Sequence, residues 1–69
     1  MKKIKINTET INLDQFLKWA NIVSSGGEAK FLIKKGKVVV NSEIEKRRGT
    51  NLSPGDIVEI EDQKYKIIT

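Results

Sequence analysis

The chain has 69 residues, of which 38% are hydrophobic and 32% charged, and its net charge is +4. This composition predicts one globular domain, residues 1–69, rather than a disordered segment. The absence of cysteine and histidine excludes disulfides, thiolate chemistry, the usual zinc sites and histidine acid–base catalysis. No apolar run approaches the roughly 20 residues that span a bilayer. We therefore expect a soluble, cytoplasmic monomer without metal or cofactor.

The N-terminal part of the chain predicts a strand and a first helix. Lysine and isoleucine alternate over residues 2–7, which is typical of a short strand. Asn12 can cap a helix over residues 13–21. Trp19 is expected at the edge of the core, and Lys18 on the far face of this helix. The apolar residues recur at helical spacing and form one buried stripe, Leu13, Phe16, Leu17 and Ala20.

A second helix is predicted after the Gly26-Gly27 pair. Ser25 and Glu28 have the spacing of a capping box, in which each side chain bonds a free amide of the first turn. Gly36 lies where the helix should end, because glycine tolerates the left-handed conformation of a C-terminal cap. The buried stripe of this helix is Ala29, Leu32, Ile33 and Gly36.

Lysines border that stripe at a spacing that places them together. Lys30, Lys34 and Lys37 follow one another at i, i+4 and i+7, with no acidic residue among them. Like charges at this spacing cost about 0.2–0.5 kcal/mol per pair, which an anionic partner would offset. A merely solvated lysine face is the alternative. Phe31 points away from the stripe, so that it either packs under a loop or against Trp19, or is exposed and free to stack on a base.

The C-terminal half predicts strands joined by tight turns. Turns are expected at Asn41-Ser42, at Ser53–Asp56 as a type II turn, and at Asp62-Gln63. They separate four strands, over residues 37–41, 43–45, 57–61 and 65–68. The resulting order is β-α-α-β-β-β-β. We therefore predict an α+β fold in which two N-terminal helices pack on one side of a small, mostly antiparallel sheet.

The positive charge is concentrated in the middle of the chain. Residues 30–48 hold seven basic and two acidic side chains, a net charge of +5 against +4 for the whole chain. The densest run is Lys46-Arg47-Arg48, and arginine binds phosphate oxygens through two parallel hydrogen bonds. A basic patch of this kind favours a nucleic acid as partner, although a loop of this composition can also be only solvated.

One set of residues recurs in a known order and spacing. It consists of Leu13-Asp14, Phe16-Leu17, Ser25, Glu28-Ala29-Lys30, Leu32-Ile33, Gly36, Val38, Val40-Asn41 and Pro54-Gly55-Asp56-Ile57. In these residues the chain resembles the RNA-binding domain named for ribosomal small-subunit protein S-four, in its stand-alone YaaA-like bacterial branch. The match covers about residues 11–60. Two positions where the family often has arginine are Asn12 and Gly26 here, and a frequent glycine is replaced by Ser42.

The resemblance implies a non-catalytic protein that contacts structured RNA, such as ribosomal RNA or an assembling ribosomal particle. Lys30 and Lys34 match family positions that touch the RNA backbone, the amides of Gly26 and Gly27 could replace one missing arginine contact, and the other residues are added from charge and exposure. A protein-interaction module that uses the basic patch or an edge strand is the alternative, and charge alone does not separate RNA from DNA. The candidate RNA-binding residues are Lys18, Gly26, Gly27, Lys30, Phe31, Lys34, Lys37, Lys46, Arg47 and Arg48.

Overall fold

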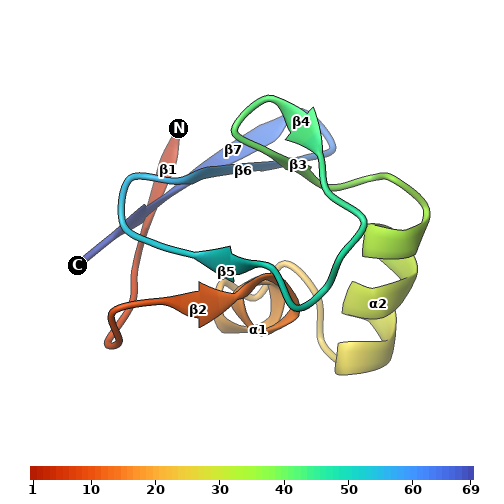
Figure 1. The fold of residues 1–69 in the computed structure, drawn as a ribbon, viewed down its shortest axis with the longest axis horizontal. Helices are drawn as coiled ribbons and strands as arrows, with labels where there is room; N and C mark the ends of the chain where they lie inside the picture. Colours follow the sequence, from red (N-terminus) through yellow and green to blue (C-terminus); the bar gives the residue numbers. More distant parts are fainter.

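Two helices cover one face of a five-stranded sheet in the computed structural model, which describes residues 1–69 (Figure 1). Neither helix is long and apolar enough to cross a membrane. The elements are β1 (Lys2–Lys5), β2 (Ile11–Asn12), α1 (Leu13–Trp19), α2 (Gly26–Lys34), β3 (Val39–Val40), β4 (Glu43–Ile44), β5 (Asn51–Leu52), β6 (Ile57–Ile60) and β7 (Gln63–Ile68).

The large sheet has the strand order β1-β7-β6-β3-β4, in which β1 runs parallel to β7 and all other neighbours are antiparallel. The predicted α+β class, with two helices and a mostly antiparallel sheet, is confirmed. The structure adds a small second ladder, in which β2 pairs with β5. These strands have two residues each, too few to show an alternating pattern in the sequence.

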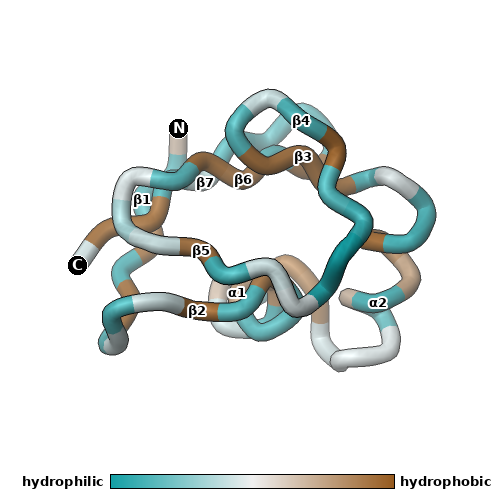
Figure 2. Tube along the Cα trace, in the orientation of Figure 1, coloured by the Kyte–Doolittle hydropathy of each residue, from teal (hydrophilic) through white to brown (hydrophobic).

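The core lies between the helices and the inner face of the sheet. Figure 2 shows hydrophobic residues along β3 and β6 and a hydrophilic connection from β4 to β5. Alternation along the strands sends every second residue inward, so that Val38 and Val40 share the inner face as predicted. The buried residues are Ile6, Leu13, Phe16, Leu17, Val23, Ala29, Ile33, Val38, Leu52, Val58, Ile60 and Ile67.

The start of α1 depends on a distant segment rather than on its predicted cap. Asn12 has the extended backbone of an N-cap, but its side chain makes no capping hydrogen bond. Instead, the amides of Leu13 and Asp14 donate to the carbonyl oxygens of Thr50 (2.9 Å) and Arg48 (3.1 Å). The helix ends at Trp19, two residues before the predicted end, and Asn21 has a positive φ of 59°.

Two of the three predicted turns are confirmed, and the third is shifted. Asn41 and Ser42 both have positive φ, 49° and 73°, as a two-residue hairpin turn requires. Gly55 has φ 100° within a Ser53–Asp56 turn closed by a 3.0 Å hydrogen bond, as predicted for type II. The last turn is Glu61-Asp62 rather than Asp62-Gln63, because the ladder pairs Ile60 with Gln63.

Candidate nucleic-acid interface

Helix α2 is held at its N-terminus by the predicted capping residues, with one change. The Oγ of Ser25 accepts a 3.2 Å hydrogen bond from the amide of Glu28. The Glu28 carboxylate accepts from the amide and the hydroxyl of Ser24, at 3.0 and 3.2 Å, instead of from the amide of Ser25. The serine half of the capping box is therefore as predicted, and the glutamate half is shifted by one residue to Ser24.

The outer face of α2 is basic and carries no compensating acid. Ala29 and Ile33 are buried, while Lys30, Lys34 and the neighbouring Lys35 are exposed. The structure has one ion pair within 4 Å, and it does not include any lysine. The lysines of α2 therefore present their charges to solvent without a carboxylate partner, at the spacing that the sequence predicts.

Phe31 is 58% exposed, so it packs neither under a loop nor in the core. The Nζ of Lys35 lies 5.5 Å from the centre of its ring, within the range of a cation–π contact. Lys35 is absent from the predicted site. Its i+4 spacing from Phe31 is the signal that could have identified it, because residues four apart on a helix are neighbours.

The basic loop after β4 touches both helices. Gly36 follows α2 with φ 74°, and a Cβ built there would lie 3.6 Å from Cε of Lys46 and 3.7 Å from Cγ2 of Ile44. The stem of Lys46 therefore lies beside the C-terminal end of α2. Two residues later, the carbonyl of Arg48 accepts from the amide of Asp14 at the start of α1. The loop thus lies between the two helices, with the Lys46 side chain beside α2 and a backbone hydrogen bond to α1.

Arg47 is the one basic residue of this loop with an acidic partner. Its Nε lies 3.1 Å from Oε2 of Glu45, and its amide donates to the same oxygen at 3.1 Å. The hydrogen bonds from the guanidinium and the amide lower the pKa of the Glu45 carboxyl. The contact with Glu45 fixes the orientation of the Arg47 side chain. Because this side chain is 82% exposed, its remaining donors face solvent.

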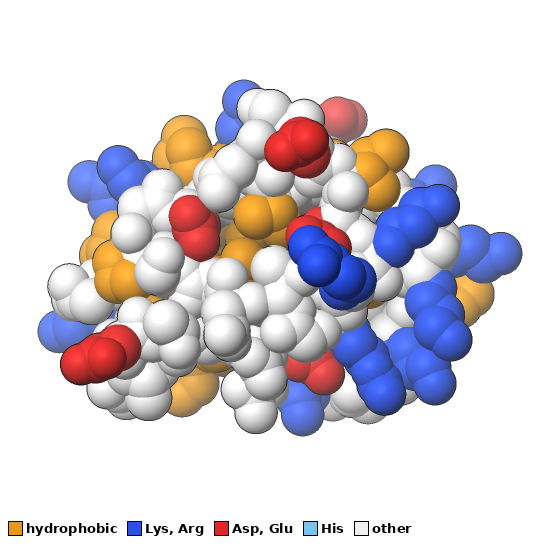
Figure 3. All heavy atoms as spheres, viewed as in Figure 1, with side chains coloured by type: hydrophobic (Ala, Val, Ile, Leu, Met, Phe, Trp, Pro, Cys, Tyr) orange, Lys and Arg blue, Asp and Glu red, His pale blue; other side chains and the backbone are white.

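The predicted residues extend along the whole of α2. Gly26 and Gly27 lie at its N-terminal end, roughly 13 Å of helix away from Lys46. The space above Gly26 is open, since a Cβ there would meet nothing within 4 Å. Glu28 lies at this same end. Figure 3 shows basic side chains gathered over α2 and the adjoining loops. Lys37, between α2 and β3, and Arg48, in the loop after β4, are both exposed.

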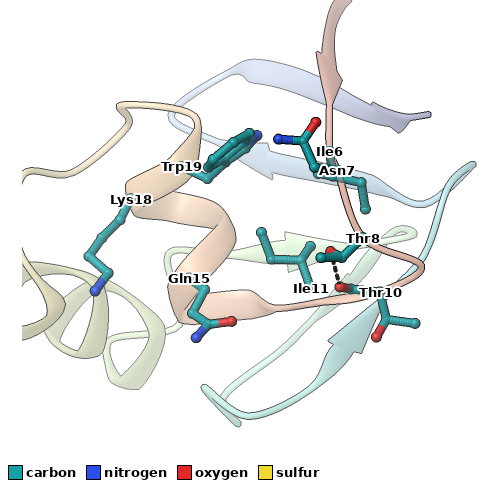
Figure 4. Close-up of a pocket in the computed structure, with 8 residues that line it drawn as sticks. All are labelled: Ile6, Asn7, Thr8, Thr10, Ile11, Gln15, Lys18 and Trp19. Atoms are coloured by element: carbon teal, nitrogen blue, oxygen red, sulfur yellow. Dashed lines mark hydrogen bonds between the residues drawn. The ribbon is translucent and has the colours of Figure 1, made fainter.

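Lys18 lies at the edge of a groove beside α1 rather than in the loop. In Figure 4 it extends away from the other side chains that line the groove. The groove has a volume of about 720 Å³. Trp19 closes one side of it, 49% exposed, with its Nε1 donating to the carbonyl of Lys5 at 2.8 Å. The lining residues are Ile6, Asn7, Thr8, Thr10, Ile11, Gln15, Lys18 and Trp19.

Comparison with known proteins confirms the resemblance seen in the sequence. The chain is 52% identical over 58 residues to the probable ribosome maturation protein RlbA of Bacillus subtilis (strain 168), a match that covers 84% of this chain and 82% of that protein. Its fold matches YbcJ of E. coli, whose solution structure has an αL motif involved in RNA binding, with TM-score 0.75, 23% identity and coverage of 100% and 89%. It also matches 30S ribosomal protein S4e of Thermoplasma acidophilum, with TM-score 0.65, 17% identity and coverage of 87% and 32%. The model of the S4 domain matches residues 4–68, and the chain belongs to the S4 domain family.

Proposed function

We propose that this protein binds structured RNA without catalysing a reaction, as a single cytoplasmic domain that acts as a monomer in ribosome assembly. The observation that carries the proposal is the basic face of α2, free of acidic partners and continuous with the loop at residues 46–48. Membership of the S4 domain family and the similarity to RlbA support RNA of the ribosome as the partner.

The exposed cations bind the RNA backbone rather than its bases. Lysine ammonium groups act as mobile point charges on phosphates, and each contact releases a counterion. Lys30 and Lys34 supply contacts along α2, while Lys46 and Arg48 supply contacts from the loop. Phe31 offers a partly exposed ring on which an unpaired base stacks, once Lys35 moves from the ring to a phosphate. Binding of this kind depends on the shape of the RNA more than on its sequence.

Acidic side chains in this fold act as structural hydrogen-bond acceptors, which supports binding over catalysis. Glu28 accepts from Ser24 at the start of α2. Asp56 accepts from the amide of Ser53 at 2.8 Å and from the side chain of Asn41 at 3.1 Å, and so joins two turns. These two carboxylates hold a helix cap and a pair of turns, and they lie in different parts of the chain.

The test compares binding of a ribosomal RNA hairpin and of a DNA duplex at two salt concentrations. We expect RNA to be preferred, and the triple variant Lys30→Glu/Lys34→Glu/Lys46→Glu to bind it at least 100-fold more weakly, because roughly three phosphate contacts are replaced by repulsion. In a plot of the logarithm of the binding constant against the logarithm of the salt concentration, the slope should become smaller in magnitude by about one for each lost contact.

A matched control is available on β1. Lys2 is exposed on β1, which lies at the opposite end of the molecule from α2 (Figure 1). The variant Lys2→Glu changes the net charge as much as Lys34→Glu does. Circular dichroism checks that each variant is folded. If a folded triple variant binds RNA as the wild type does, the α2 face is only solvated, and an acidic protein partner becomes the better interpretation.

A further inference from the structure

The face of the sheet opposite the helices carries a second group of cations. Ile4 and Ile67 pair with each other and point into the core, so their neighbours along the strands point outward. Lys3 is paired with Lys66 on this outer side. We call this surface the open sheet face. Its charged residues are Lys3, Lys5, Lys64, Lys66 and Glu59.

No element covers the open sheet face. On the inner side of β6 and β7, Val58 and Ile67 are fully buried. On the outer side, Lys3, Lys5 and Lys64 are exposed, and Lys66 and Glu59 are half-buried. None of the outward residues of these strands belongs to the core. Figure 3 shows basic side chains that project at the end of the molecule where β1 and β7 lie, away from α2. The surface is therefore available to a partner.

The arrangement of these lysines is unfavourable for the free protein. Lys3 and Lys66 occupy directly opposed positions on adjacent strands, where like charges destabilise a sheet. Glu59 is the only acid on this face, and although it is opposed to Lys64 the two form no ion pair within 4 Å. Four lysines against one glutamate leave an excess of positive charge that an anionic ligand would relieve.

The lysines form a narrow strip. Lys5 and Lys64 lie on either side of the Lys3–Lys66 pair, so the strip runs along the strands for about 13 Å, with about 5 Å between the two strands. A strip of regularly spaced charges suits a polyanion with one charge per repeat. The face has no aromatic side chain on which a base could stack and no arginine that could form two hydrogen bonds to a base. Its contacts would therefore be with phosphates.

We propose that the open sheet face is a second RNA-binding surface, which contacts the phosphate backbone of an RNA segment other than the one bound by α2. The proposal rests on the proposed function for the class of ligand but uses different residues. The sheet and the core separate this face from α2, in a molecule with extents of 28 × 21 × 18 Å. Because charges are screened beyond about 8 Å at physiological salt, the two surfaces act independently, and one protein molecule bridges two RNA segments.

The experiment counts the RNA molecules bound to the full chain. A short RNA hairpin, too small to reach both surfaces, is titrated into the protein, and the mass of the complex is measured by sedimentation equilibrium. We expect two hairpins per wild-type molecule at about 0.1 M salt, where the Debye length is about 10 Å. The variant Lys3→Gln/Lys66→Gln should bind one hairpin with the affinity of the tighter wild-type site, whereas Lys2→Gln, which changes the adjacent residue on the inner side of β1, should still bind two.

Three results would overturn the inference: saturation of the wild type at one hairpin, two hairpins on the Lys3→Gln/Lys66→Gln variant, or occupation of the face by a polyglutamate peptide in preference to RNA. The triple variant Lys30→Glu/Lys34→Glu/Lys46→Glu separates the two proposals. If the triple variant binds one hairpin, and this binding is lost when Lys3→Gln and Lys66→Gln are added to it, both surfaces bind RNA. If the wild type binds one hairpin and the triple variant none, the α2 surface alone binds RNA and the open sheet face does not.

Discussion

The two basic surfaces of this molecule are built in different ways. The surface on α2 and its adjoining loop comes from one continuous segment, residues 30–48, whose net charge of +5 is visible in the sequence. The open sheet face joins the first residues of the chain to the last through the parallel pairing of β1 with β7. Residues 49–69 hold two basic and four acidic side chains, a net charge of −2 that conceals the two lysines of this face.

The difference shows that the net charge of a continuous segment predicts a charged surface well on a helix and poorly on a sheet. Along a helix, residues four apart are neighbours, so sequence spacing reveals which charges gather. In a sheet, the neighbours of a residue depend on the register with another strand. The negative net charge of residues 49–69 suggests that acids neutralise Lys64 and Lys66. However, Glu61 and Asp62 lie in a turn beyond the end of β6, not on the open sheet face.

The largest effect should come from removing the packing that holds β7 in the sheet. Ile67 is fully buried and pairs with Ile4 on β1, so we expect Ile67→Ala to destabilise the fold by about 2–5 kcal/mol. The adjacent Ile68 faces outward and is only partly buried, and Ile68→Ala should cost about 1 kcal/mol or less. Denaturant unfolding measures both. Equal losses would mean that the open sheet face is packed as tightly as the inner face.

A smaller effect, on affinity, should distinguish the two surfaces. Glu45→Gln releases the Arg47 guanidinium and removes an acid from the loop, so binding of the first RNA hairpin should tighten roughly two- to five-fold. Glu59→Gln makes the same change in net charge on the open sheet face, and it should tighten the second hairpin instead. Titration of each variant with RNA tests this. An identical response of both sites to both variants would indicate a general effect of net charge.

Glu45→Gln should also alter the dependence of stability on pH. Arg47 lowers the pKa of the Glu45 carboxyl below its ordinary value of 4.5 in the folded state. The pair therefore stabilises the protein above pH 4.5, and this contribution is lost as the pH falls through the folded pKa. Acid unfolding followed by circular dichroism should show a shallower loss of stability below pH 4.5 in the variant than in the wild type.

The smallest effect should be a gain in stability on the open sheet face. Lys3→Gln removes the repulsion from Lys66, and we expect the Tm at low salt to rise by roughly 1–4 °C. The gain should vanish at 1 M salt, where charges are screened beyond about 3 Å. Lys2→Gln, opposed to Tyr65, should leave the Tm nearly unchanged. A fall in the Tm of Lys3→Gln would show that Lys3 contributes packing that outweighs the repulsion.

The sequence by itself determined the features that depend on contacts within a few residues. These are α2 with its Ser25 cap and its lysines, the hairpin turn at Asn41-Ser42 and the turn at Ser53–Asp56. Each is governed by backbone sterics or by hydrogen bonds that close over three or four positions, so residue type and spacing are enough to predict it.

Only the tertiary structure decided the features that join distant segments. The first amides of α1 are capped by carbonyls of residues 48 and 50 rather than by Asn12, and the parallel pairing brings Lys3 beside Lys66. Phe31 is exposed although its sequence position allows packing. Long-range hydrogen bonds and burial depend on which segments meet in the folded chain, and the local pattern of residues carries no information on that choice.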